Sequence, residues 1–183
     1  VITEFDGVLR FKDQHVIQKV EADNQLAIGT LTNLIYSPEH WHPALTGKIS
    51  FAQWQQNSLE AIHDNYNHQI AYKFLTALRE SESSVDTRLI LQYKNLFPDA
   101  CYCLATNATD RLNDDLIVAN LELQFDQIFN SSVMGICKPN RGFYSALLMT
   151  LGVSPTEVLF IDSSQVNCDA ASIIGMNVIQ YNN

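Results

Sequence analysis

Two acidic residues near the start of the chain, Glu4 and Asp6, are separated by one position and follow a short apolar segment. Alternate residues of a β-strand point to the same side, so both carboxylates are expected to face one small site. Such a pair can hold a cation while one carboxylate attacks an electrophile and the other transfers a proton. The spacing therefore predicts nucleophilic and acid–base chemistry at the end of the first strand.

Further polar residues occur where later apolar segments end. These positions are Thr106 with Asn107, Lys138 before Pro139, and Asp162. A hydroxyl, an amide and an ammonium group suit an anion, and a further carboxylate suits a cation. A lone example of any of these would usually be a turn, a solvated loop or a helix cap. Their occurrence together, each after a predicted strand, favours one shared site.

The elements that would position these groups follow from the hydrophobic pattern. After the first strand, residues 13–79 have helical character, with a capping box at Ser50 that opens one helix. The polar segment 80–84 is interpreted as a linker. From about residue 85, helix and strand patterns alternate, with strands predicted over 101–105 and 157–161.

This order predicts an α/β fold, a doubly wound parallel (Rossmann-like) sheet with helices on both faces and an inserted all-α cap. The core domain is predicted over 1–11 and 85–183, and the helical cap subdomain over 12–84. In such sheets the ligand crevice lies beyond the carboxyl ends of the strands. All the polar positions named above fall at those ends.

Four short segments resemble, in order, the motifs of the haloacid dehalogenase-like hydrolases, most of which are Mg-dependent phosphatases. Segment 4–9, Glu-Phe-Asp-Gly-Val-Leu, is similar to the opening motif Asp-x-Asp-Gly-Val/Thr-Leu. Thr106-Asn107 and Lys138-Pro139 are similar to the second and third motifs, and segment 162–167 is similar to the fourth. The resemblance covers nearly the whole chain, including a cap of the helical type inserted after the first motif.

The resemblance implies a role for each position. Glu4 stands where the family has the aspartate that attacks phosphorus, and Asp6 stands where a second aspartate protonates the leaving group and then activates water. Thr106, Asn107 and Lys138 would bind the phosphate, and Lys138 would also neutralise the nucleophile. The implied catalytic residues are therefore Glu4, Asp6 and Lys138.

The resemblance also implies a Mg²⁺ site made of Glu4, the main-chain oxygen of Asp6, and Asp162. Two positions depart from the family. Glu4 replaces the attacking aspartate, and Ser163 replaces the second acid of the fourth motif. Loss of one acid is expected to weaken Mg²⁺ binding. The extra methylene of Glu4 displaces its carboxylate, and a displacement of about 1 Å can slow a reaction about a hundredfold. We therefore expect impaired turnover.

Three functions follow as alternatives: an impaired phosphatase for a small phosphorylated metabolite, a noncatalytic protein that binds a phospho-ligand or a protein partner, and, as a weaker alternative, a haloacid dehalogenase. The formal net charge of −9 disfavours binding to a nucleic-acid backbone. With no apolar segment long enough to cross a membrane and no signal sequence, we expect a cytoplasmic protein.

Overall fold

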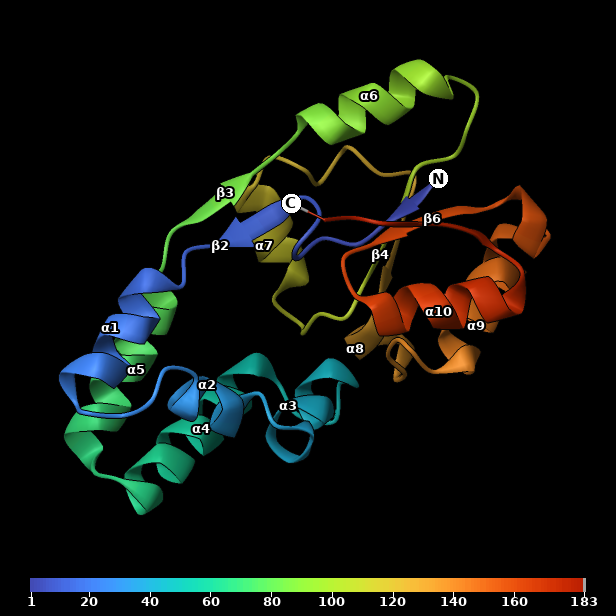
Figure 1. Cartoon of the computed structure of the whole chain (residues 1–183). Helices are drawn as coiled ribbons and strands as arrows, with labels where there is room; N and C mark the ends of the chain where they lie inside the picture. Colours follow the sequence, from blue (N-terminus) through green and yellow to red (C-terminus); the bar gives the residue numbers. More distant parts are fainter. Residues whose placement is uncertain (183) are drawn as a thin grey trace.

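The structure, a computed structural model, describes residues 1–182. Its centre is a parallel sheet in the order β5-β4-β1-β6-β7. The strands are β1 (Ile2–Thr3), β4 (Cys103–Thr106), β5 (Gln127–Asn130), β6 (Leu159–Asp162) and β7 (Asn177–Gln180). β1 lies between β4 and β6, so the first strand of the chain is at the middle of the sheet (Figure 1).

Helices cover both faces of this sheet. They are α6 (Arg88–Leu96), α7 (Leu112–Val118), α8 (Ser131–Met134), α9 (Arg141–Leu151), the 3₁₀ helix η1 (Pro155–Glu157) and α10 (Gln165–Ile174). Alternate strand residues separate the two faces: Phe160 packs with α9 and α10, whereas Ile161 packs with α6 and α7. The predicted doubly wound α/β fold is confirmed.

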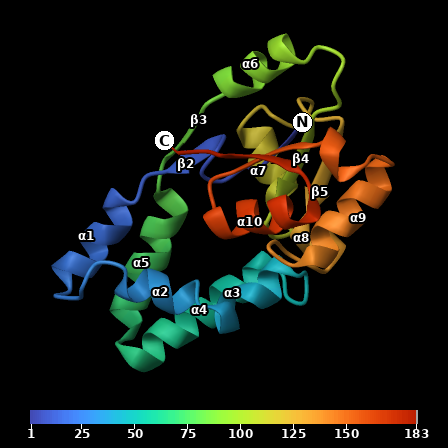
Figure 2. The same cartoon turned by 45° about the vertical axis from the view of Figure 1, so that its right-hand side comes forward.

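Along the chain, five helices separate β2 (Arg10–Lys12) from β3 (Ser83–Val85), and these two strands pair as a short antiparallel ribbon. They are α1 (His15–Asp23), α2 (Thr30–Ile35), α3 (Pro38–Leu45), α4 (Phe51–Asn65) and α5 (His68–Glu80). We call α1–α5 the cap; Figures 1 and 2 show these helices gathered at one end of the sheet. Their apolar side chains form a cluster of their own around Trp54 and Phe74.

Local signals in the cap match the structure in one place and differ in another. Ser50 accepts a hydrogen bond from the Gln53 main-chain N–H at the start of α4, so one half of the predicted capping box is present. The Gln53 side chain donates to Asn57 Oδ1. Segment 80–84 is not a loose linker, because Ser83 and Ser84 pair with β2. Short polar strands give no hydrophobic pattern, and their pairing depends on backbone groups far apart in the sequence. The predicted domain boundaries fall inside this ribbon.

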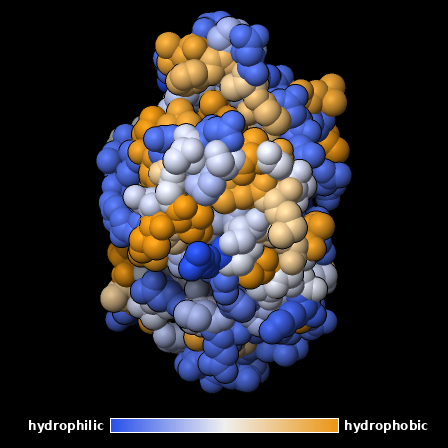
Figure 3. Space-filling model, turned by 90° about the vertical axis from the view of Figure 1, so that its right-hand side faces the viewer, coloured by the Kyte–Doolittle hydropathy of each residue, from blue (hydrophilic) through white to orange (hydrophobic). Residues whose placement is uncertain are grey.

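Among the described residues, none of the helices has both the length and the apolar character needed to span a bilayer. On the face drawn in Figure 3, apolar residues are interspersed with polar ones, and the lower end, where the cap lies, is largely hydrophilic.

Candidate active site

A buried ion cluster joins the ends of β1 and β6. Lys138 Nζ donates to Asp162 Oδ2 at 2.6 Å, to the Ala105 main-chain oxygen at 2.7 Å, and to Glu4 Oε2. The side chain of Lys138 is fully buried, and those of Glu4 and Asp162 are almost so. The structure therefore brings together three of the predicted site residues, which lie up to 158 positions apart in the sequence.

The sheet explains why these residues meet. Glu4 directly follows β1 and its main-chain N–H donates to the Ile161 oxygen of β6 at 2.9 Å. Asp162 ends β6, and Ala105 lies in β4 on the other side of β1. Neighbouring parallel strands end at one edge, so the cluster occupies the crevice predicted for a doubly wound sheet.

The side chain of Glu4 folds back toward its own main chain. Its Oε1 accepts a hydrogen bond from the Phe5 N–H at 2.7 Å, while its Oε2 is held by Lys138. Both carboxylate oxygens of Glu4 thus have a donor. Any attack on a ligand by this carboxylate would have to displace at least one of these hydrogen bonds.

Burial dominates the electrostatics of the cluster. Desolvation raises the pKa of Glu4, Lys138 opposes this rise, and the nearby Asp162 carboxylate adds to it. Desolvation alone would lower the pKa of Lys138, but Glu4 and Asp162 raise it above its ordinary value. Two carboxylates share one ammonium, so the cluster carries one surplus negative charge when all three groups are ionised.

Asp162 is held by two further donors. The Ser164 main-chain N–H donates to its Oδ1 at 2.8 Å, and Asn167 Nδ2 donates to its Oδ2 at 3.0 Å. Asn167 is buried in the first part of α10 and was not among the predicted site residues. Its place in the fourth motif was the available signal, because a helix that begins after Asp162 brings residue 167 back toward that carboxylate.

Thr106 and Asn107, which with Lys138 are predicted to bind phosphate, differ in their surroundings. Thr106 Oγ1 is buried and has no hydrogen-bond partner in the described part of the chain. The amide of Asn107 instead exchanges two hydrogen bonds with the main chain of Lys138, at 2.9 and 2.8 Å. Thr106 therefore offers a free hydroxyl beside the cluster, whereas Asn107 fixes the loop that carries Lys138.

Asp6 lies apart from the hydrogen bonds of the cluster. Its two carboxylate oxygens accept from Arg10 Nε at 2.6 Å and from Arg10 Nη2 at 2.9 Å. The expected shared orientation with Glu4 is lost because β1 ends at Thr3 and the chain turns at Gly7, whose φ is +82°. The same turn returns Arg10 to Asp6, and no local sequence pattern predicts that pairing.

The sequence of this chain is similar to those of known hydrolases. No protein-family model matches the sequence. The (S)-2-haloacid dehalogenase of Xanthobacter autotrophicus is 27% identical over 179 residues, which cover 83% of this chain and 71% of that protein. Bifunctional epoxide hydrolase 2 of Sus scrofa is 25% identical over 152 residues, or 74% of this chain, and the matched part is 27% of its length.

Solved structures show the same architecture. A HAD (haloacid dehalogenase-like) family enzyme from Bacteroides thetaiotaomicron, in complex with magnesium and inorganic phosphate, superposes with a TM-score of 0.74 and 17% identity over 99% of this chain and 92% of that one. This chain has the haloacid dehalogenase-like fold. L-2-haloacid dehalogenase from Xanthobacter autotrophicus, with chloropropionic acid covalently bound, superposes with a TM-score of 0.63 and 19% identity over 97% and 74% of the two chains. The predicted resemblance is confirmed for the fold.

The haloacid dehalogenase-like fold includes proteins that bind magnesium, so the predicted Mg²⁺ set requires a test of fit. Glu4 and Asp162 both contact Lys138, and both oxygens of Asp6 contact Arg10. In residues 1–182, no group of three or more His, Cys, Asp or Glu side chains is arranged to hold a metal ion. The predicted set takes only two carboxylates, those of Glu4 and Asp162, together with the main-chain oxygen of Asp6. Both carboxylates contact Lys138, so as placed they would have to release this lysine to hold Mg²⁺.

Ser163, which stands in place of the second acid of the fourth motif, has a packing role in this chain. A Cβ atom added to Gly7 would lie 2.5 Å from Ser163 Oγ and 3.2 Å from its Cβ. The serine therefore packs directly against the turn that follows Asp6. A longer acidic side chain at this position would have to point away from that turn.

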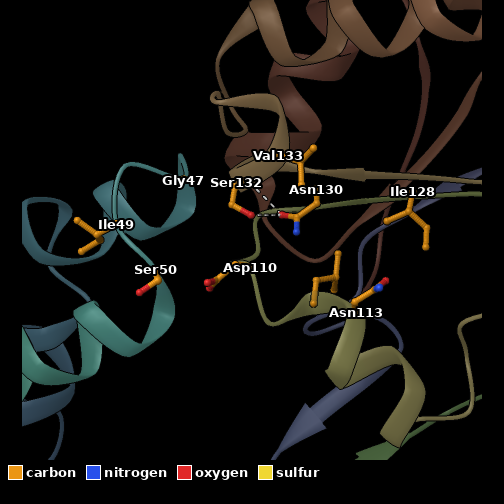
Figure 4. A pocket seen from close by; sticks show the side chains of 10 residues that line it. Gly47, Ile49, Ser50, Asp110, Asn113, Ile128, Asn130, Ser132 and Val133 are labelled. Carbon is orange, nitrogen blue, oxygen red and sulfur yellow. Dashed lines mark hydrogen bonds between the residues drawn. The ribbon is translucent and has the colours of Figure 1, made fainter.

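A cavity of about 610 Å³ lies between the cap and the edge of the sheet near β5, and none of Glu4, Lys138 and Asp162 lines it (Figure 4). Asp110 projects toward the cap in this region, and its Oδ1 accepts from the Phe51 main-chain N–H at 2.8 Å. The described residues that line the cavity include this carboxylate and no lysine or arginine. It therefore lacks the charge expected of a phosphate pocket.

Proposed function

We propose that this chain is a phosphatase-type hydrolase for a small phosphorylated molecule, with slow turnover. The observation that carries this proposal is the buried contact of Lys138 with Glu4 and Asp162 at the carboxyl ends of the central strands. The lysine supplies positive charge for an anion, and the unpartnered Thr106 hydroxyl can donate to a phosphoryl oxygen.

The proposed reaction uses residue 4 and Asp6 in turn. A carboxylate oxygen at position 4 attacks phosphorus, the bond from phosphorus to the leaving oxygen breaks, and Asp6 gives that oxygen a proton. Asp6 then takes a proton from water as the water oxygen attacks the phosphoryl group. Phosphate leaves and the carboxylate at position 4 is restored.

Slow turnover follows from the geometry of Glu4. The side chain is one methylene longer than aspartate, folds back to the Phe5 N–H, and is bound by Lys138. For in-line attack, this carboxylate would have to break its hydrogen bonds to both donors and move into line with the phosphorus atom. An error of about 1 Å in its position can slow the reaction about a hundredfold. Glu4 carries the same negative charge as the aspartate of the family and is buried. We therefore expect the same reaction at a lower rate.

Weak magnesium binding belongs to the same proposal. The similar enzyme from Bacteroides thetaiotaomicron was crystallised in complex with magnesium and inorganic phosphate. In this chain the carboxylates of Glu4 and Asp162 are neutralised in part by Lys138, and Ser163 supplies no charge. Mg²⁺ requires near-ideal octahedral oxygen coordination, which these paired side chains do not offer without rearrangement.

The test is phosphate release from an aryl phosphate by the wild-type protein and by the Glu4→Asp variant, each with and without Mg²⁺. We expect Glu4→Asp to be at least about tenfold faster, because the shorter side chain restores the reach of the family's nucleophile. Full activity of the wild-type protein, with no change in Glu4→Asp, would contradict the proposal. Inorganic phosphate binding without turnover in either protein would favour the noncatalytic alternative.

A haloacid dehalogenase is the second candidate. It is favoured by the 27% identity to the (S)-2-haloacid dehalogenase. Attack by a carboxylate at position 4 on the halogen-bearing carbon would form an ester and release halide, and water would then hydrolyse the ester and restore the carboxylate. Chloride release from 2-chloropropionate by Glu4→Asp, with no release of phosphate from phosphomonoesters, would select this candidate.

A further inference from the structure

Arg10 restrains the second acid of the site. Both oxygens of Asp6 accept hydrogen bonds from the Arg10 guanidinium, in the two-pronged geometry that makes such pairs strong. A carboxylate oxygen bound in this way has to give up a hydrogen bond before it can carry a proton to a leaving group. Arg10 itself cannot take over that role, since a guanidinium stays protonated at working pH.

Arg10 is itself fixed by two other groups. Its Nη1 donates to Asp115 Oδ2 at 2.8 Å, and its guanidinium lies 4.2 Å from the centroid of the Phe5 ring. The Arg10 side chain is 11% exposed, whereas the Asp6 side chain is 46% exposed. The arginine is therefore the anchored member of the pair, and Asp6 is the member that can move.

The backbone also holds Arg10 in place. It is the first residue of β2 and pairs with Val85 of β3, and its main-chain N–H donates to the Phe5 oxygen at 2.8 Å. Asp115 lies in α7, on the core. The ribbon that leads to the cap and a helix of the core thus meet at one guanidinium group, beside the acid that the proposed reaction needs.

We propose that Arg10 is a positioning residue that holds Asp6 out of proton transfer, so that Arg10 and Glu4 together limit turnover. This inference rests on the proposed function, because it concerns the same phosphoryl-transfer site. It adds that correcting Glu4 alone leaves the reaction short of its general acid.

The choice of substrate separates this role from a general effect on structure. An aryl phosphate such as 4-nitrophenyl phosphate has a leaving group that departs as a stable anion and needs little help from an acid. A simple alkyl phosphate has a poor leaving group that needs a proton as the bond to phosphorus breaks, and general acid catalysis contributes about 10²–10⁴-fold in such cases. Freeing Asp6 should therefore favour the alkyl substrate selectively.

The experiment compares Glu4→Asp with Glu4→Asp/Arg10→Gln on both substrates. We expect Arg10→Gln to raise kcat/KM for the alkyl phosphate by about tenfold or more, and for the aryl phosphate by less than about threefold. Arg10→Lys, which keeps the charge but loses the two-pronged contact, should give an intermediate increase. Each variant is checked for folding by circular dichroism.

Arg88 provides a matched control. It makes the same two-pronged contact with Asp86, at 2.9 and 2.7 Å, but its side chain is 83% exposed and lies at the start of α6. Arg88→Gln in the Glu4→Asp background should leave both kcat/KM values unchanged. An equal change from Arg88→Gln and Arg10→Gln would overturn the proposal.

A pair of variants at Asp6 tests the inference even if Arg10→Gln does not fold. Asp6→Asn should lower alkyl phosphate turnover by a larger factor in the Glu4→Asp/Arg10→Lys background than in the Glu4→Asp background, because loss of the two-pronged contact frees Asp6 to transfer protons. An equal loss in the two backgrounds would overturn the role of Arg10 while leaving the proposed function intact. No phosphate release by any of these variants, from either substrate, would overturn the proposed function and the role of Arg10 with it.

Discussion

One ammonium group serves two carboxylates at the centre of this site. The order of the motifs was enough to predict that Glu4, Lys138 and Asp162 would meet at the carboxyl ends of the strands. Glu4 and Asp162 lie at the ends of the neighbouring strands β1 and β6, whereas Lys138 is separated from β5 by the short helix α8, which the sequence did not predict. The conformation and hydrogen bonds of each side chain could not be predicted from the sequence. The hydrogen bond from the Phe5 N–H to Glu4 depends on rotamers within a buried cluster, which no spacing rule describes.

The raised pKa of Glu4 predicts that the stability of the folded protein depends on pH. The pKa of Glu4 is raised by burial, so the folded protein binds a proton more tightly than the unfolded chain does. The stabilising contribution of protonated Glu4 is full below its ordinary pKa of 4.5 and is lost as pH rises through its raised value. Each tenfold difference in proton affinity between the folded and unfolded protein corresponds to about 1.4 kcal/mol of stability.

Glu4→Gln should remove this dependence. We expect the free energy of unfolding of Glu4→Gln to increase relative to that of the wild-type protein as pH rises above about 4.5, since the variant has no buried carboxylate to ionise at this position. Urea denaturation of both proteins at a series of pH values measures the difference. A difference that stays constant with pH would show that Glu4 carries no raised pKa.

Asp6 illustrates what residue patterns miss. Its place two positions after Glu4 suggested a shared site, yet its partner is Arg10, a residue without a motif position. The pairing arises from the turn at Gly7 and from the anchoring of Arg10 by Asp115, more than one hundred positions away. Sequence spacing predicts which strand end a residue occupies, but not which neighbour neutralises its charge.

At the scale of elements, the cap is positioned by a short ribbon and by two contacts with the core. One contact joins Phe51 to Asp110, and the other brings Gly47 close to Ser132. Strands β4 and β6 were predicted within two residues of their observed limits, because apolar runs mark buried strands. The β2–β3 ribbon was not predicted, since its residues are mostly polar and its strands have three residues each. It is this ribbon that joins α1 and α5 to the core.

The approach of the cap to α8 predicts an unusual cost at Gly47. A Cβ added there would lie 2.2 Å from the Ser132 main-chain oxygen, and the residue has φ +67°. Gly152 provides the control, because it has φ +66° and no atom within 4 Å of an added Cβ. The two glycines share the backbone penalty, and Gly47 alone has the steric one.

We therefore expect Gly152→Ala to lower the free energy of unfolding by about 1 kcal/mol, the cost of a left-handed backbone for a residue with a side chain. Gly47→Ala should cost about 1–3 kcal/mol more, as overpacking does in other proteins. Urea denaturation measures both. Equal losses would mean that the cap does not lie against α8 as described.

At the scale of the whole molecule, apolar side chains form three separate clusters, two on the faces of the sheet and one within the cap. The switch from helical to alternating pattern along the sequence anticipated this separation, because an insert rich in helices must bury its own apolar residues. The cavity beside Asp110 was not anticipated. It depends on how two independently packed bodies meet, which is a property of their surfaces.

The tryptophans allow the cap to be followed on its own. Both tryptophans of the sequence, Trp41 and Trp54, belong to the cap cluster and pack against each other with ring centroids 4.6 Å apart. The cap has no strand in the main sheet and its own cluster, so it is expected to unfold more readily than the core.

Tryptophan fluorescence should therefore change at a lower urea concentration than far-ultraviolet circular dichroism, which reports all helices and the sheet. Coincident transitions from the two probes would show that cap and core unfold as one cooperative unit.

The proposed chemistry places the attacking carboxylate at position 4, and a covalent intermediate reports that position directly. The Glu4→Asp variant is mixed with an aryl phosphate, quenched in acid during turnover and digested, and the peptide that contains residue 4 is examined by mass spectrometry. We predict one phosphoryl group attached at position 4 in this variant and little or none in the wild-type protein. Turnover by the variant with that peptide unmodified, or equal phosphorylation and turnover in both proteins, would contradict the proposed role of residue 4.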